Sequence, residues 1–204
     1  HIQISISEQV GLEGRKTFYD QTGAMRDMVQ NHLLQLLCLV AMEPPNRLQA
    51  DKIRTEKLKV LQALRPLTGH DISRSVVRGQ YVRGIMGGKE VSSYAEDLGH
   101  DSETETFVAI KAHIDNWRWT GVPFYLRTGK RLPERKTEIM IQFKHVPHSI
   151  FAGQGAEAQP NRLIIGIQPQ ENVRLSVMAK QPGLDRGGVR LQEVPLDISM
   201  PNAF

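Results

Sequence analysis

The sequence predicts an α+β fold, with a large, mostly antiparallel β-sheet and helices packed on one of its faces. Two helical patterns occupy the first third of the chain, whereas the segments after position 75 alternate as strands do. Helices and strands do not follow one another in the regular βαβ rhythm that is typical of parallel sheets. No G-x-G-x-x-G fingerprint occurs, so the sequence shows no Rossmann unit.

The first elements are expected to be a strand and two helices. His1–Ser7 alternates between isoleucine and polar residues, which predicts a strand with one buried side, and a turn follows at Gly11–Gly14. From about Thr22 to Met42, apolar residues recur at three- and four-residue spacing, and the second half is apolar nearly all round. This helix should therefore be buried. The second helix, from about Ala50 to Arg65, is amphipathic and should lie on the surface.

Strands are expected through the rest of the chain, separated by loops at Gly84–Ser102 and Phe151–Asn161. Several of them alternate cleanly, and in one of these Ile139, Ile141 and Phe143 lie on the face opposite to Met140, Gln142 and Lys144. The predicted strands are Val76–Val82, Thr104–Ile114, Pro123–Arg127, Thr137–His145, Arg162–Gln168, Val173–Ala179 and Val189–Leu196.

Composition narrows the class of protein. Hydrophobic residues make up 40% of the 204 positions and charged residues 24%, which suits a globular protein in water. The longest apolar run, Leu33–Met42, is shorter than the ~20 residues of a membrane helix, and the start of the chain has no signal-peptide pattern. The only cysteine, Cys38, can form no internal disulfide. We therefore expect a cytoplasmic protein without a membrane partner.

The net charge of +4 leaves the partner open. A basic balance is compatible with nucleic acid or with a phosphorylated small molecule. The basic residues are scattered apart from one denser stretch, Arg127–Lys136, and no nucleic-acid-binding signature surrounds them. We expect no nucleic-acid partner.

Two segments carry residues that are suited to chemistry. Asp27, Gln30, Asn31 and His32 are polar residues at the entry of an otherwise apolar helix. Because a buried polar group must be hydrogen-bonded, they form either a structural network or one wall of a polar cavity. Histidine is the side chain best suited to accept a proton near neutral pH.

The second segment runs from Gly121 to Lys136, where a strand ends at Gly129 and a turn presents several cations. Clustered Lys and Arg at a strand end can hold a phosphate or sugar hydroxyls. A solvated basic turn is the other interpretation. Neither segment by itself names a reaction.

Four blocks taken together resemble a known family. They are Ile4–Arg15, RDMVQNHLLQLLCLVAMEPP, DNWRWTGVPFYLRTGKRLPERKTEI and NRLIIGIQPQENVRLSVMAKQPG, in this order. The series resembles the C-terminal domain of glucose-6-phosphate dehydrogenases over essentially the whole chain. The resemblance implies the oxidation of glucose 6-phosphate to 6-phosphogluconolactone with NADP, in the pentose phosphate pathway.

The resemblance also implies roles for single residues. His32, in QNH, matches the catalytic base, which takes the proton of the anomeric hydroxyl. Asp27, in RDM, and Glu8, in SEQVGLEGR, match carboxylates that bind sugar hydroxyls, and ionised carboxylates are hydrogen-bond acceptors. Lys130, in TGK, and Arg135 match two substrate-binding cations, and either could meet the phosphate. No residue of this chain is expected to bind the catalytic coenzyme or a metal.

Other parts of the family pattern are missing. The coenzyme fingerprint, the E-K-P lysine and the H-Y-L-G-K segment of the family do not occur. We therefore expect residues 1–204 to be part of the C-terminal domain, without the coenzyme domain and the last helices, and to be inactive alone. Some family members hold a second, structural NADP against the sheet. The residues that match that site are Met140, Gly166, Arg174 and Ser176, which makes the site doubtful although Lys136 and Gln168 remain.

Two classes of function follow. The first is the substrate domain of a dehydrogenase that forms a homo-oligomer, a dimer or a tetramer, through its sheet, as family members do. The second is a non-catalytic module that uses the same sheet only to associate.

Overall fold

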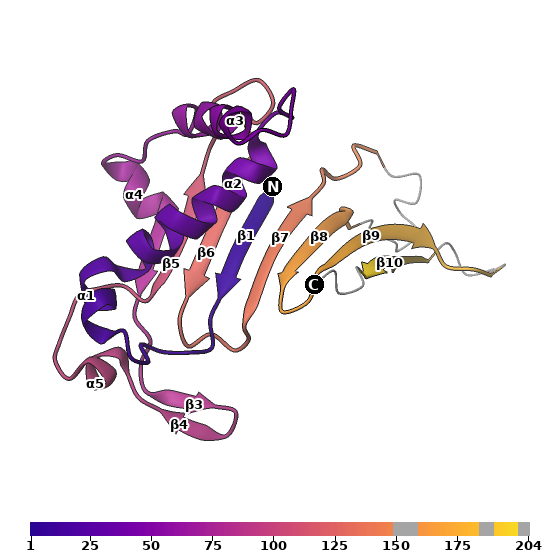
Figure 1. The fold of residues 1–204 in the computed structure, drawn as a ribbon. Helices are drawn as coiled ribbons and strands as arrows, with labels where there is room; N and C mark the ends of the chain where they lie inside the picture. The colour runs from indigo at the N-terminus through magenta and orange to yellow at the C-terminus, as the bar shows by residue number, and fades with distance from the viewer. Residues whose placement is uncertain (149–158, 184–189, 200–204) are drawn as a thin grey trace.

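The structure, a computed structural model, describes residues 1–148, 159–183 and 190–199. At its centre lies an eight-stranded sheet in the spatial order β10-β9-β8-β7-β1-β6-β5-β2 (Figure 1). Its strands are β1 (Ile2–Ser7), β2 (Val76–Gly79), β5 (Phe107–Ala112), β6 (Phe124–Gly129), β7 (Lys136–Gln142), β8 (Arg162–Gln168), β9 (Asn172–Lys180) and β10 (Leu191–Ser199). All neighbouring strands are antiparallel except β1 and β6, which run parallel. The predicted α+β fold with a mostly antiparallel sheet is confirmed.

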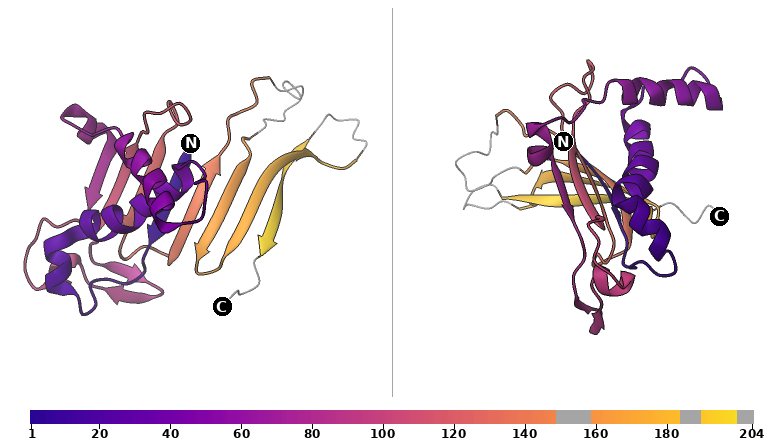
Figure 2. Two further views of the ribbon diagram at one scale, coloured as in Figure 1. Left: turned by 45° about the horizontal axis from the view of Figure 1, so that its top comes forward. Right: turned by 90° about the vertical axis from the view of Figure 1, so that its left-hand side faces the viewer.

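One long helical run crosses a face of this sheet, as the two views of Figure 2 show. The helices are α1 (Lys16–Ala24), η1 (Met25–Leu33), α2 (Leu34–Ala41), α3 (Ala50–Gln62), α4 (His70–Ser75) and α5 (Tyr94–Leu98). A short hairpin, β3 (Gly84–Met86) with β4 (Lys89–Val91), projects from the body (Figure 1). Among the described residues, none of the helices combines the length and apolar character that crossing a bilayer requires.

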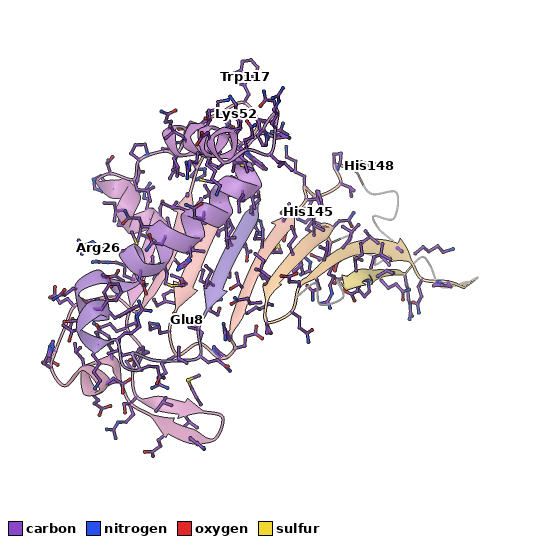
Figure 3. The ribbon with its side chains drawn as sticks, in the orientation of Figure 1. Glu8, Arg26, Lys52, Trp117, His145 and His148 are labelled. Atoms are coloured by element: carbon purple, nitrogen blue, oxygen red, sulfur yellow. The ribbon has the colours of Figure 1, made fainter. Side chains whose placement is uncertain are left out.

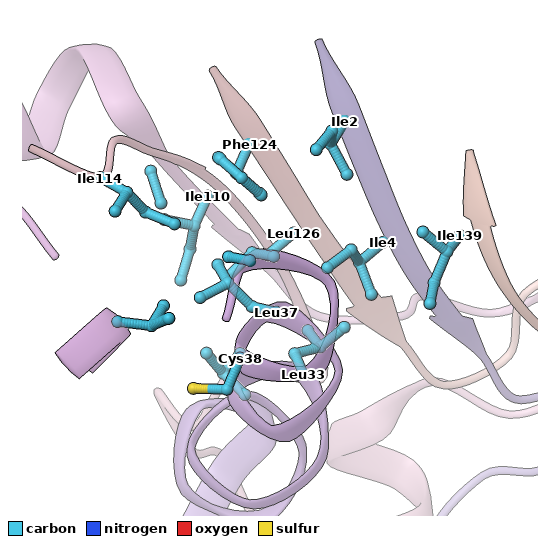
Figure 4. Close-up of a cluster of buried hydrophobic side chains, with 14 of the residues drawn as sticks. Ile2, Ile4, Leu33, Leu37, Cys38, Ile110, Ile114, Phe124, Leu126 and Ile139 are labelled. Carbon is cyan, nitrogen blue, oxygen red and sulfur yellow. The ribbon is translucent and has the colours of Figure 1, made fainter. Parts of the chain in front are cut away.

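The main core lies between the helical run and the central strands (Figure 4). Leu33 and Leu37 are fully buried there. Ile4 of β1 is paired with Leu126 of β6 and with Ile139 of β7, so the three side chains point to the same face. Burial of one such side chain stabilises the fold by about 1.5–3 kcal/mol. This packing fixes η1 and α2 over β1 and its two neighbours.

The prediction of one helix from Thr22 to Met42 is wrong in two respects, the residue at which the helix starts and the type of helix that follows. Gly23, at φ 65° and ψ 178°, interrupts it, and α1 precedes the break. The chain then winds as the π-helix η1 before it becomes α-helical. Glu105 fixes the restart, because its main-chain oxygen accepts from the amide of Ala24 at 3.0 Å and its carboxylate from that of Met25 at 2.9 Å. A contact across 80 positions leaves no trace in local periodicity.

The predicted loop Gly84–Ser102 is also wrong, because it contains β3, β4 and α5. Helix α5 begins at a capping box in which Ser93 and Glu96 hydrogen-bond each other's main-chain amides. The second predicted helix ends at Gln62 instead of Arg65. A helix of six residues, α4, follows and was not expected.

Several predicted strands are shorter or shifted. The strand expected over Val76–Val82 ends at Gly79, and the one expected over Thr104–Ile114 covers Phe107–Ala112. The strand expected to reach His145 ends at Gln142. Most of the predicted loop 151–161, and Val189 at the start of the last predicted strand, lie outside the described residues.

Gly23 should tolerate no side chain. An added Cβ would lie 2.6 Å from the Glu105 carboxylate, at a positive φ. We expect Gly23→Ala to lower the free energy of unfolding by about 1–3 kcal/mol, measured by urea denaturation of this chain. Gly14→Ala is the control, because nothing lies within 4 Å of that position. Equal stability of the two variants would contradict the role given to Glu105.

Candidate active site

A concave pocket of about 640 Å³, the site pocket, opens beside the end of β1. It is lined by residues 6–10 as the chain leaves β1, by one side of η1 and α2, by the start of β7 and by the end of β8. Ser7 is paired with Lys136 of β7, and Thr137 lies opposite Gln168 of β8. The sheet therefore brings three segments that are distant in sequence to the same end of its strands, and the helical run supplies the fourth.

Glu8 forms one wall of this pocket and is tied to Lys130. Because β1 and β6 are parallel and Ser7 is paired with Gly129, the two strands leave the sheet at the same end, and the next residues are Glu8 and Lys130. Figure 3 shows Glu8 at this end of the sheet. The Lys130 ammonium donates to Glu8 Oε2 at 2.9 Å. The amide of Glu8 donates to the Gly129 carbonyl and its own carbonyl accepts from Leu132, so the main chain is fixed as well.

Lys130 lies behind this wall. Its side chain is only 8% exposed, against 28% for Glu8, and it does not line the site pocket. Its amide donates to the main-chain oxygen of Thr106 at 3.0 Å. Lys130 therefore contacts the pocket through the Glu8 carboxylate.

His32 and Asp27 come from η1. His32 is exposed and lines the site pocket. In an α-helix, residues five apart point about 140° away from each other. In η1 the hydrogen bonds span five residues, as between the amide of Leu34 and the carbonyl of Val29, which turns Asp27 and His32 towards a common side. Asp27 lies 3.6 Å from the guanidinium of Arg15.

Arg135 is the exposed cation of the pocket. It precedes β7, lines the site pocket and makes no ion pair with the described residues. Of the five residues selected from the sequence, Glu8, His32 and Arg135 thus share the pocket. Lys130 joins them by its bond to Glu8, and Asp27 lies on the same helix as His32.

Sequence reasoning missed the side chains that support this arrangement. Tyr19 of α1 is buried, and its ring centroid lies 4.9 Å from the Lys130 ammonium. Burial, and then the nearby Glu8 and Asp27 carboxylates, raise the pKa of its phenol strongly. Gln35, which accepts from Lys57 at 2.7 Å, also lines the pocket. A lone tyrosine or glutamine has no motif by which a sequence could select it.

A second hollow, of about 650 Å³, adjoins the site pocket and shares Gln9, Arg135 and Gln168 with it. Lys136 lines it and is paired with Glu138 at 2.8 Å. Arg174 lines it as well and is paired with Asp197 at 2.5 Å. The family resemblance relates both cations to a structural NADP site. In this structure each of them already forms an ion pair with a carboxylate. Within the described residues, no three His, Cys, Asp or Glu residues are grouped as a metal site requires.

Comparison with known proteins identifies the family of the chain. The profile of the family described as "Glucose-6-phosphate dehydrogenase, C-terminal domain" matches residues 1–204. The chain belongs to this family. Its relatives include the glucose-6-phosphate 1-dehydrogenases of Zymomonas mobilis, 57% identical over 204 residues, and of Rhizobium meliloti, 56% identical over 205 residues. Both alignments take in 100% of this chain but only 42% and 41% of the relatives, so the chain spans about two fifths of their length.

Solved glucose-6-phosphate dehydrogenases have the same fold. A structure described as glucose-6-phosphate dehydrogenase in complex with its substrate glucose-6-phosphate superimposes with a TM-score of 0.83 at 40% identity, over 97% of this chain and 39% of that chain. The enzyme from Mycobacterium avium superimposes with a TM-score of 0.82 at 41% identity, over 98% of this chain and 40% of that chain.

Proposed function

We propose that this chain is the sugar-phosphate domain of an NADP-dependent glucose-6-phosphate dehydrogenase. The reaction is the oxidation of glucose 6-phosphate to 6-phosphogluconolactone. The observation that carries the proposal is the site pocket, which is lined by His32, Glu8 and Arg135. Arg135 makes no ion pair within the described part of the chain. Oxidation of a sugar phosphate requires a base that accepts a proton, a group that accepts hydrogen bonds from the sugar hydroxyls, and a cation that binds the phosphate.

Each residue has a separate task. His32 accepts the proton of the anomeric hydroxyl, as a general base does. Glu8 and Asp27 accept hydrogen bonds from other sugar hydroxyls. Arg135 is exposed and makes no ion pair with the described residues, whereas Lys130 is committed to Glu8, so Arg135 is the better placed of the two for the phosphate.

The hydride acceptor comes from elsewhere. The coenzyme, which we propose to be NADP, would take the hydride from C1 of the sugar. The sequence has no glycine-rich fingerprint to hold it, and the two cations named above in the second hollow are paired with carboxylates. We propose that residues 1–204 act with a coenzyme domain and further helices of a longer protein, in the pentose phosphate pathway of the cytosol.

The second class of function, association through the sheet, accompanies the first in our proposal. Leu196 and Ile198 of β10 are 52% and 63% exposed. The residue between them, Asp197, points to the other face and is paired with Arg174. An apolar strand face of this kind favours a homo-oligomer, a dimer or a tetramer, formed through the sheet.

Light scattering tests this association. We expect the chain to exceed the mass of a monomer at micromolar concentration and Leu196→Lys to return it to a monomer, because a charge would be buried at the contact. Leu48→Lys is the control, since Leu48 is 92% exposed but lies outside the sheet. A monomeric wild-type chain would refute association by this domain alone.

His32→Asn tests the base in the full-length protein that carries this domain. We expect kcat to fall by about 10²–10⁴-fold with little change in KM, because the amide keeps the polarity but accepts no proton. His145→Asn is the control, since Figure 3 shows His145 at the end of the sheet opposite to Glu8. An unchanged kcat in the His32 variant would place the base elsewhere.

The isolated chain should be inactive. Hydride transfer requires reacting atoms about 3–3.5 Å apart, and the chain has no fingerprint to hold the coenzyme. We expect no reduced coenzyme to form at any glucose 6-phosphate concentration, and a sugar-phosphate Kd of about 1 mM or weaker, equivalent to about 4 kcal/mol or less. Absorbance and titration calorimetry measure the two. Turnover that His32→Asn abolishes would show that the chain holds its own coenzyme.

A further inference from the structure

Tyr19 is buried next to the charged wall of the site pocket, although it does not line the pocket itself. Its side chain is 1% exposed and belongs to a small cluster with Leu12 and Tyr94, separate from the main core. The Lys130 ammonium lies 4.9 Å from the centre of its ring. A cation at this distance is attracted by the electron-rich face of the ring.

The hydroxyl group of Tyr19 does not explain this position. It is buried and has no hydrogen-bond partner among the described residues. Burial and three carboxylates, Glu8, Asp27 and Glu105, raise the pKa of the phenol, so the side chain stays neutral. A buried hydroxyl without a partner destabilises the fold. Tyr19 therefore contacts Lys130 through its ring and not through its oxygen.

The Lys130 side chain borders a second hollow, into which its ammonium group could move. Besides its bond to Glu8, it lines a hollow of about 380 Å³ on the side of the β3–β4 hairpin, together with Tyr81 and Arg131. Ammonium groups on four-carbon stems move easily between such positions. Attraction to the Tyr19 ring favours the position of the ammonium at Glu8. Without the ring, the ammonium would occupy that position less of the time.

We propose that Tyr19 is a positioning residue whose ring holds the Lys130 ammonium against Glu8, so that the Glu8 carboxylate keeps the orientation in which it accepts hydrogen bonds from the sugar. The proposal rests on the function proposed above. The line of contact runs from Tyr19 to Lys130 and from Lys130 to Glu8, which forms the pocket wall. The ring thus acts on substrate affinity, while His32, which does not contact it, governs the proton transfer.

The test compares three variants of the full-length protein by steady-state kinetics. For Tyr19→Leu we expect KM for glucose 6-phosphate to rise about 3- to 30-fold, the range of one cation–π contact, with kcat changed less than about twofold. Tyr19→Phe, which keeps the ring, should restore the wild-type KM. Tyr94→Leu is the matched control, because Tyr94 is equally buried in the same cluster and packs edge-on against Tyr19 at 6.5 Å. It should lower thermal stability without raising KM.

Replacement of Tyr19 by progressively fluorinated phenylalanine covers the case in which Tyr19→Leu does not fold. Fluorine withdraws charge from the ring face while the volume hardly changes, so KM should rise stepwise with each fluorine. A flat series overturns the proposal. So does a Tyr19→Phe variant as weak as Tyr19→Leu, or an equal rise of KM in Tyr94→Leu. A wild-type protein that does not oxidise glucose 6-phosphate refutes the proposed function instead.

Discussion

The candidate site depends on one pairing, the parallel alignment of β1 with β6. In an antiparallel sheet, neighbouring strands leave at opposite ends, so residues that follow two adjacent strands are far apart. Here Ser7 lies beside Gly129 with both strands pointing the same way, and the next residues are Glu8 and Lys130. The ion pair between them, the pocket wall and the contact with Tyr19 all follow from this alignment.

The helical run supplies the opposite wall, and two local departures from α-helical geometry set its direction. Gly23 allows the chain to turn sharply, and Glu105 then satisfies the first amides of the new helix. The π-winding of η1 turns Asp27 towards the side of His32. Leu33 and Leu37 hold the run against the sheet, so the polar side of the helix faces the pocket.

The charged side chains at the pocket differ in whether they form ion pairs. The two carboxylates expected to bind sugar hydroxyls are each accompanied by a cation, Glu8 by Lys130 and Asp27 by Arg15. Arg135, in contrast, makes no ion pair with the described residues and is exposed. Under the proposed function, a phosphate could bind Arg135 without first breaking any ion pair found in the described part of the chain.

The sequence alone determined the fold class, the positions of most strands along the chain and, through the family resemblance, the choice of Glu8, Asp27, His32, Lys130 and Arg135. Alternation and helical spacing are local, and so are motifs, which is why they could be read without a structure. Only the tertiary structure decided that β1 pairs in parallel with β6, that η1 winds as a π-helix, and that Tyr19 lies beneath Lys130. The strand pairing and the contact of Tyr19 with Lys130 join segments that are far apart in the sequence, to which local periodicity is blind.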